Sequence, residues 1–315
     1  MRILSKENCF RGVYTALVTP FSNSGKIDFN AWDRLLEKQI TGGTQGIIPC
    51  GTTGESPTLS EAEKINLIEY SVKKCSGKIQ VIAGTGNNDT AKTVEFNAKV
   101  SKLGVDACLV VTPYYNKPSQ AGLKAHYEAI AEASQVPLIL YNVPGRAVVS
   151  LAPATVAELA LHEKIVGIKE ASGNINLFLE MKEAVRTKTK KPFFFLSGDD
   201  LTFWPFLGSG GDGAISVAGN LFPNCLRMIF EDWCEGRVGA GLALFEKLLP
   251  LFETLFIEAN PVPIKTILSE IGLIDFNVRL PLVSLTEENR TKLLATWNAL
   301  LEHLKQDRPR EDLRG

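Results

Sequence analysis

Eight short apolar runs, separated by segments of helical periodicity, constrain this chain more than any other feature. The runs lie at residues 13–18, 46–50, 79–84, 107–111, 138–142, 165–169, 193–197 and 213–217. Most are continuously apolar, as in parallel strands that are buried on both faces. Strand and helix repeated eight times predict a (β/α)₈ (TIM) barrel. A doubly wound open sheet is the alternative, but eight units is a large number for one.

Several of the intervening helices carry start signals. Asp28 and Asp89 stand where N-caps would fall for helices near 29–41 and 90–103. Ser60 with Glu63 forms a capping-box pattern for another helix. Pro153 opens one near 153–161, because proline is favoured in a first helical turn.

The strand pattern stops near residue 236, and three helices are expected beyond it, near 238–257, 261–271 and 286–305. We therefore expect a catalytic barrel at 1–236 and a helical extension at 237–315, packed on the barrel rather than forming a separate functional module. The tail from about 306 is rich in charge, and we expect it to be frayed.

Composition excludes several classes of protein. The formal net charge is −1, which gives no basic excess for nucleic acid or an anionic membrane. No stretch is long and apolar enough for an ordinary transmembrane helix, and the first ten residues lack the apolar run of a signal peptide. Six scattered cysteines without a C-x-x-C pair predict reduced thiols and a cytoplasmic protein. His126, His162 and His303 lack the spacing of a metal site, and no metal is expected.

The end of the sixth apolar run holds an unusual residue, Lys169. Either this lysine caps a strand and reaches solvent, or burial keeps its amine neutral as a nucleophile. Tyr141 ends the preceding run. Because adjacent strands lie about 4.8 Å apart, the phenol and the amine could meet at the barrel mouth, where such enzymes hold their chemistry. Alone, Tyr141 would more simply be a core tyrosine.

Two loops after predicted strands suggest anion binding. "GTTGE" (51–55) offers free backbone N–H groups and two hydroxyls, a cradle for a carboxylate or phosphate, although an ordinary βα turn is equally compatible. Arg146 follows a Pro-Gly pair and is either a solvated loop charge or a bidentate carboxylate clamp.

In their order along the chain, "GTTGES", "VTPYYNKPS", "ILYNVPGR", "GIKEASGN", "LSGDD" and "GAISV" resemble the dihydrodipicolinate synthase (4-hydroxy-tetrahydrodipicolinate synthase) family. The resemblance runs from "FRGVYTALVTPF" near residue 10 to "EANPVPIK" (258–265) and beyond. The wider superfamily of pyruvate-dependent class I lyases and aldolases, which includes N-acetylneuraminate lyase, shares the fold and the lysine–tyrosine pair.

The resemblance implies that Lys169 forms a Schiff base with pyruvate. Thr52 and Thr53 would hold the pyruvate carboxylate, and Thr53 would also pass protons. Tyr141 would act as general acid and base, and Tyr115 would complete the relay from a neighbouring subunit. A chain of hydroxyls suits this task because each one both donates and accepts.

The resemblance also assigns the second substrate. Arg146 would bind the carboxylate of aspartate semialdehyde, while Gly198 and Ile215 would line the pocket, with the Ile215 carbonyl near the lysine. Sialic-acid lyases lack this arginine and read Ser-Thr at Thr52-Thr53, so both features favour the synthase. The alternative of the same chemistry is another 2-keto-acid aldolase such as N-acetylneuraminate lyase. The alternative of another class is a barrel that binds small acids without turnover.

Two departures from the family pattern bear on specificity and regulation. Ala147-Val148 replaces the usual Thr-Gly after the arginine, which affects the loop that holds Arg146 more than imine formation. A lysine-binding allosteric pocket would be lined by Ser56, Lys64, Asn88, Lys92 and Tyr114. Lysine-inhibited relatives place an acidic residue at Lys92 and often a histidine or glutamate at Lys64. Two cations there should repel a lysine ammonium, so we predict weak or absent feedback inhibition.

The resemblance also implies the substrates, the cofactor requirement and the oligomeric state. The substrates are the small molecules pyruvate and aspartate semialdehyde, and no cofactor is needed because the imine itself is the electron sink. A homodimer supplies Tyr115, commonly within a homotetramer.

Overall fold

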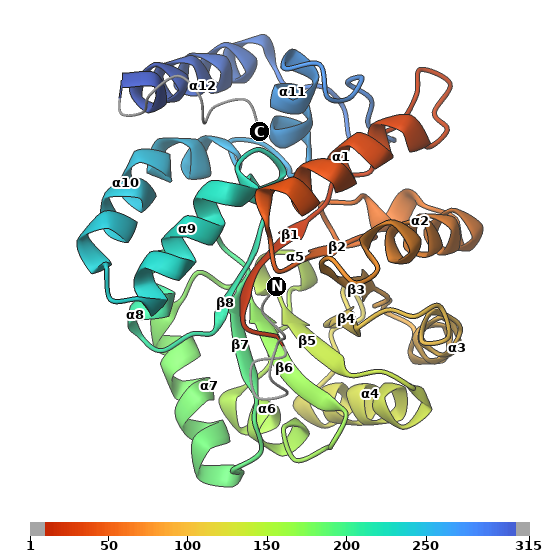
Figure 1. Ribbon diagram of the computed structural model, residues 1–315. Helices are drawn as coiled ribbons and strands as arrows, with labels where there is room; N and C mark the ends of the chain where they lie inside the picture. Colours follow the sequence, from red (N-terminus) through yellow and green to blue (C-terminus); the bar gives the residue numbers. More distant parts are fainter. Residues whose placement is uncertain (1–9, 307–315) are drawn as a thin grey trace.

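The computed structural model describes residues 10–306 as a closed barrel of eight parallel strands in the order β1 to β8 (Figure 1). The strands are β1 Gly12–Ala16, β2 Gly46–Ile48, β3 Gln80–Gly84, β4 Ala107–Val111, β5 Leu138–Asn142, β6 Ile165–Glu170, β7 Phe194–Ser197 and β8 Gly213–Ser216. The (β/α)₈ prediction is confirmed, and the open-sheet alternative is excluded because β1 pairs with β8.

Helices follow the strands and surround them. The α-helices are α1 Phe29–Gly42, α2 Glu61–Cys75, α3 Thr90–Val100, α4 Gln120–Ala133, α5 Pro144–Ala147, α6 Pro153–Leu159, α7 Ile175–Lys188, α8 Phe203–Gly208, α9 Pro223–Cys234, α10 Val238–Thr254, α11 Val262–Glu270 and α12 Glu287–Gln306. Short 3₁₀ turns, η2 and η3, occupy Ser56–Thr58 and Ala218–Asn220. The predicted caps are present: Asp28 and Asp89 accept from backbone N–H groups, and Ser60 with Glu63 forms a complete capping box.

Two strands end two residues before their apolar runs do, and each early end has a physical cause. In β1, the N–H of Val18 donates to Asn220 Oδ1 at 3.1 Å instead of to a neighbouring strand. In β2, Pro49 has no N–H to donate, and Cys50 adopts a left-handed φ of 58° that leaves the sheet. The predicted strands at 13–18 and 46–50 were therefore too long by two residues each.

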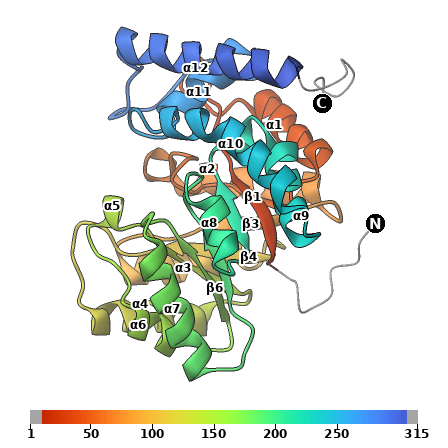
Figure 2. The ribbon, with the colours of Figure 1, turned by 90° about the vertical axis from the view of Figure 1, so that its left-hand side faces the viewer.

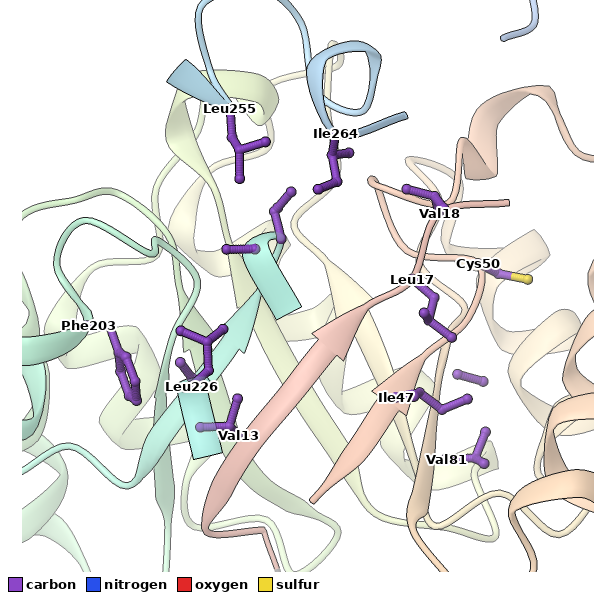
Figure 3. Close-up of a cluster of buried hydrophobic side chains, with 14 of the residues drawn as sticks. Val13, Leu17, Val18, Ile47, Cys50, Val81, Phe203, Leu226, Leu255 and Ile264 are labelled. Atoms are coloured by element: carbon purple, nitrogen blue, oxygen red, sulfur yellow. The ribbon is translucent and has the colours of Figure 1, made fainter. Parts of the chain in front are cut away.

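The strand residues alternate between two cores. Tyr14, Ile48 and Ile82 belong to the cluster inside the barrel, whereas Val13, Ile47 and Val81 belong to the larger cluster between strands and helices. Figure 3 shows these last three side chains on the outer side of their strands. Because successive side chains in a strand point to opposite faces, the parity of a residue decides whether it faces the interior or the helices.

The three helices after α9 pack over one side of the barrel. Figures 1 and 2 show α10, α11 and α12 together above the strands. In Figure 3, Leu255 and Ile264 from this part of the chain lie beyond the carboxyl ends of the strands, and Ile264 lies near Val18. The last helices therefore cover part of the end of the barrel at which catalytic groups gather in such folds.

Two further predictions concern membrane-spanning helices and the two ends of the chain. Within residues 10–306, no helix combines the length and apolarity that a membrane span requires. The first nine residues, read above against a signal peptide, and the tail beyond 306 lie outside the described residues.

His126, in α4, makes the free energy of unfolding depend on pH in the acidic range. Burial lowers its pKa from 6.5 to about 4; Thr90 Oγ1 lies 2.9 Å from Nδ1, and Nε2 has no partner in the described chain. Between pH 6.5 and 4 the unfolded state binds the proton and the native state does not. Stability is therefore lost as pH falls through this window, by up to about 3 kcal/mol.

We expect His126→Gln to flatten this part of the profile, measured as the free energy of unfolding in urea at pH 7, 5.5 and 4. Glu63 contributes in a different pH range. Arg279 lowers the pKa of Glu63 from 4.5 to about 2, so the stability that Glu63 provides is lost only as pH falls below 4.5. An unchanged slope between pH 6.5 and 4 in the variant would contradict the assignment.

Candidate active site

Lys169 projects into the barrel interior. In the register of the sheet it pairs with Tyr141 on one side and with Leu196 on the other, and both of these belong to the inner cluster. Lys169 is 6% exposed, and its Nζ lies 4.4 Å from the centroid of the Tyr141 ring. Among residues 10–306 it makes no ion pair, which leaves the amine available to a ligand.

A cavity of about 430 Å³ opens beside this pair. Thr52, Tyr141 and Arg146 line it, together with residues at the ends of β3 and β4. Lys169 is not among the lining residues and lies next to the cavity, against the ring of Tyr141. The structure therefore brings an amine from β6, a phenol from β5, a threonine from the loop after β2 and a guanidinium from α5 to one end of the barrel.

Gly198 leaves the space that the lysine side chain occupies. A Cβ at this position would lie 2.7 Å from Cε of Lys169 and 2.6 Å from Cβ of Ala171. Ile215, 1% exposed, is an inner residue of β8. Gly198 acts by lacking a side chain, because any Cβ there would displace the lysine stem.

The threonine loop that follows β2 is bent by two left-handed residues, Cys50 at φ 58° and Glu55 at φ 56°. Thr53 is buried, and its Oγ1 accepts a hydrogen bond of 2.9 Å from Nδ2 of Asn260. With that lone pair engaged, the hydroxyl proton of Thr53 can still be donated to another acceptor. Thr53 is not among the residues that line the cavity. Thr52 is half-buried and faces the cavity directly.

Arg146 lies at the exposed edge of the cavity in the short helix α5. Its Nη2 donates to the backbone carbonyl of Asn260 at 3.3 Å, which leaves most of the guanidinium free for a carboxylate. Tyr115, in contrast, points away: its side chain is 87% exposed, and its φ is 75°. Within this single chain Tyr115 stays outside the cavity.

The model of the dihydrodipicolinate synthetase family matches residues 9–300. The chain belongs to this family. A 4-hydroxy-tetrahydrodipicolinate synthase of Thermodesulfovibrio yellowstonii is 48% identical over 284 residues, which cover 90% of this chain and 96% of that protein.

Solved structures of the dihydrodipicolinate synthetase family have the same fold. The 4-hydroxy-tetrahydrodipicolinate synthase of Methylacidiphilum fumariolicum SolV superposes with a TM-score of 0.91 at 44% identity, covering 94% of this chain and 98% of that one. The chloride-inhibited dihydrodipicolinate synthase of Acinetobacter baumannii, complexed with pyruvate, superposes with a TM-score of 0.88 at 40% identity, covering 92% and 98%.

One residue that links two of the predicted site residues was not singled out from the sequence. Asn260 joins Thr53 to Arg146, one through its side chain and the other through its carbonyl. It lies in the "EANPVPIK" block, which carried part of the resemblance, but no residue type there suggested a role at the barrel mouth. The available signal in the sequence was an asparagine directly before the Pro-Val-Pro segment at 261–263.

The departure from the family pattern after Arg146 has a backbone consequence. Val148 is the C-cap of α5 and holds a left-handed φ of 67°, the conformation that glycine favours. A β-branched residue adopts it at a cost of about 1–2 kcal/mol. The loop that carries Arg146 is therefore under backbone strain at the position where the resemblance predicts glycine.

The proposed allosteric residues divide between two cavities. Ser56, Lys64 and Tyr114 line the 430 Å³ cavity, and Lys64 and Lys92 line an adjoining one of about 350 Å³. Asn88 Nδ2 donates to the Tyr114 carbonyl at 3.2 Å. Lys99 pairs with both glutamates of the second cavity, and neither Lys64 nor Lys92 has a carboxylate partner within residues 10–306.

Proposed function

We propose that this protein is a lyase, a 4-hydroxy-tetrahydrodipicolinate synthase, that condenses pyruvate with L-aspartate 4-semialdehyde in the diaminopimelate route to lysine. The observation that carries the proposal is a buried lysine without an ion pair, 4.4 Å from a tyrosine ring at the mouth of a (β/α)₈ barrel. In the cytoplasm, where we place the enzyme, both substrates would be free small molecules.

Each site residue then has a chemical task. The Lys169 amine attacks the keto carbon of pyruvate, and loss of water gives the imine. Tyr141 supplies and removes protons beside that carbon, with Thr53 as its donor. Thr52 and the N–H groups of its loop hold the pyruvate carboxylate. The resulting enamine attacks the aldehyde carbon, while Arg146 holds the carboxylate of the second substrate.

A comparison of aldehydes tests the reaction. With pyruvate at saturation, turnover of aspartate semialdehyde should exceed that of N-acetylmannosamine, followed as loss of pyruvate. A preference for the sugar would favour the alternative, N-acetylneuraminate lyase. Absence of both turnover and borohydride-trapped pyruvate would favour a barrel that only binds small acids.

Arg146→Ala should weaken the binding of the second substrate, aspartate semialdehyde, and not that of pyruvate. A charge-assisted bidentate contact contributes about 1.5–3 kcal/mol, so KM for aspartate semialdehyde should rise about 10- to 100-fold. Trapping of pyruvate on Lys169 should be unchanged, because Arg146 lies at the cavity edge. Arg146→Lys keeps the positive charge but not the bidentate geometry of the guanidinium. Its KM for aspartate semialdehyde should lie between those of the wild type and Arg146→Ala. A rise in KM for pyruvate alone would contradict this assignment.

The exposed position of Tyr115 supports a dimer as the active unit. A large aromatic side chain that is 87% exposed, on a left-handed backbone, is expensive for an isolated chain. We propose that each subunit of a homodimer, alone or within a homotetramer, extends Tyr115 into the relay of its partner.

Lysine should inhibit this enzyme weakly or not at all. Lys64 and Lys92 line the cavities where a lysine effector would lie, and neither has a carboxylate partner within residues 10–306. Each repulsion of like charges near a protein surface amounts to about 1–4 kcal/mol. Lys92→Glu should therefore increase sensitivity to lysine by tenfold or more in the condensation assay. Strong inhibition of the unmodified enzyme at ordinary cellular lysine concentrations would refute the prediction.

A further inference from the structure

A fully buried ion pair joins the threonine loop to the C-terminal extension. Glu55 directly follows the Thr52-Thr53-Gly54 segment, and its carboxylate Oε1 pairs with Nζ of Lys265 in α11. The exposed fractions of the two side chains are 1% and 0%. Lys265 and Lys169 are the two buried lysines of the described chain, and Lys169 is the one that contacts a cavity-lining residue, Tyr141.

Both partners are fully satisfied. Oε2 of Glu55 accepts from the backbone N–H of Arg279 at 3.0 Å, and Nζ of Lys265 donates to the Asn277 carbonyl at 2.7 Å. The Phe21 ring lies 4.4 Å from Lys265 Nζ. Burial lowers the pKa of Lys265, and the Glu55 carboxylate opposes that effect. The pair is thus a fixed point, because hydrogen bonds to the backbone hold both partners. The Arg279 guanidinium, which pairs with Glu63, adds a further favourable charge interaction with Glu55.

This fixed point lies two residues from a proposed catalytic hydroxyl. Glu55 has a left-handed φ of 56°, which a residue other than glycine keeps only when its surroundings enforce it. The carbonyl of Gly54 accepts from Thr19 Oγ1 at 2.7 Å, and Asn260, at the start of the α11 segment, donates to Thr53. α11 and the residues just before it therefore hold the loop at two places: Asn260 holds the hydroxyl of Thr53, and Lys265 holds the side chain of Glu55.

We infer that Glu55 and Lys265 are positioning residues: their buried ion pair fixes the Thr52-Thr53 loop against α11 in the geometry that binds pyruvate and passes protons. The C-terminal extension is then part of the active site rather than only a cover over the barrel. The inference rests on the proposed function, since it assigns a role to the loop that holds pyruvate in that reaction.

The test removes both charges together, because removing one would strand the other in the interior. Glu55→Gln with Lys265→Met preserves volume. We expect this double variant to unfold at a temperature close to that of the wild type and to trap pyruvate on Lys169 with borohydride when pyruvate is saturating. Its kcat/KM for pyruvate should fall about 10- to 100-fold, because a displacement of about 1 Å of a positioning loop costs that much.

Two further variants complete the experiment. Glu55→Asp keeps the charge but shortens the link by one methylene, and it should lower kcat/KM at least tenfold even if the double variant fails to fold. Leu248→Val, at a fully buried position of α10, serves as the matched control for lost stability and should leave the kinetics unchanged. Kinetics within twofold of the wild type in the folded Glu55 variants would overturn the inference. Failure of the wild type to trap pyruvate would instead overturn the proposed function.

Discussion

Lys169→Met is expected to abolish the reaction. Methionine keeps an unbranched apolar stem in the slot between Tyr141 and Leu196, so the barrel interior should stay packed. Without the amine no imine can form, and loss of a covalent nucleophile lowers turnover by at least about 10⁴-fold. The measurement is pyruvate-dependent condensation, with borohydride trapping of the adduct and identification of the modified peptide.

The trapping experiment distinguishes the two buried lysines. In the wild type, the reduced adduct should lie on Lys169, because Lys265 is held by Glu55 and Asn277. Lys190→Met, at an exposed position, is the matched control and should trap pyruvate like the wild type. An adduct on Lys265, or full activity of Lys169→Met, would show that another residue carries the chemistry.

Gly198→Ala should have the second largest effect, although it adds only one methyl group. The new Cβ would meet Cε of Lys169 at 2.7 Å and Cβ of Ala171 at 2.6 Å. The flexible lysine stem is the partner that gives way, which moves Nζ away from Tyr141. A displacement of about 1 Å of a reacting group costs on the order of 10²-fold, so we expect that loss in the rate of imine formation.

The rate of imine formation can be followed by timed borohydride quenching after pyruvate is added. Gly239→Ala in α10 is the matched control: a Cβ there meets no atom within 4 Å, and alanine is the better helix former. It should leave the rate unchanged and maintain or raise stability. An imine rate in Gly198→Ala equal to that of the wild type would show that Gly198 does not shape the path of the lysine.

Local patterns predicted the elements well because they depend on neighbouring residues. Apolar runs of five or six residues located every strand, and Ser60 with Glu63 or Asp89 located helix starts through contacts three residues apart. The early end of β2 was also predictable, since Pro49 cannot donate. The early end of β1 was not, because the partner of the Val18 N–H is the side chain of Asn220, 202 residues away.

For the site, the sequence alone determined the repeating strand–helix units and the set of motif residues that identify the family. It left open whether Lys169 faces the barrel interior or solvent, and the register of β6 in the closed barrel decided that. The tertiary structure decided which of these residues meet: Thr53 with Asn260 across 207 positions, and Glu55 with Lys265 across 210. Periodicity and caps arise from interactions within a few residues, so they can be read along the chain. The docking of α11 on the barrel depends on the packing of whole elements, and no local pattern specifies which side chains that packing brings together.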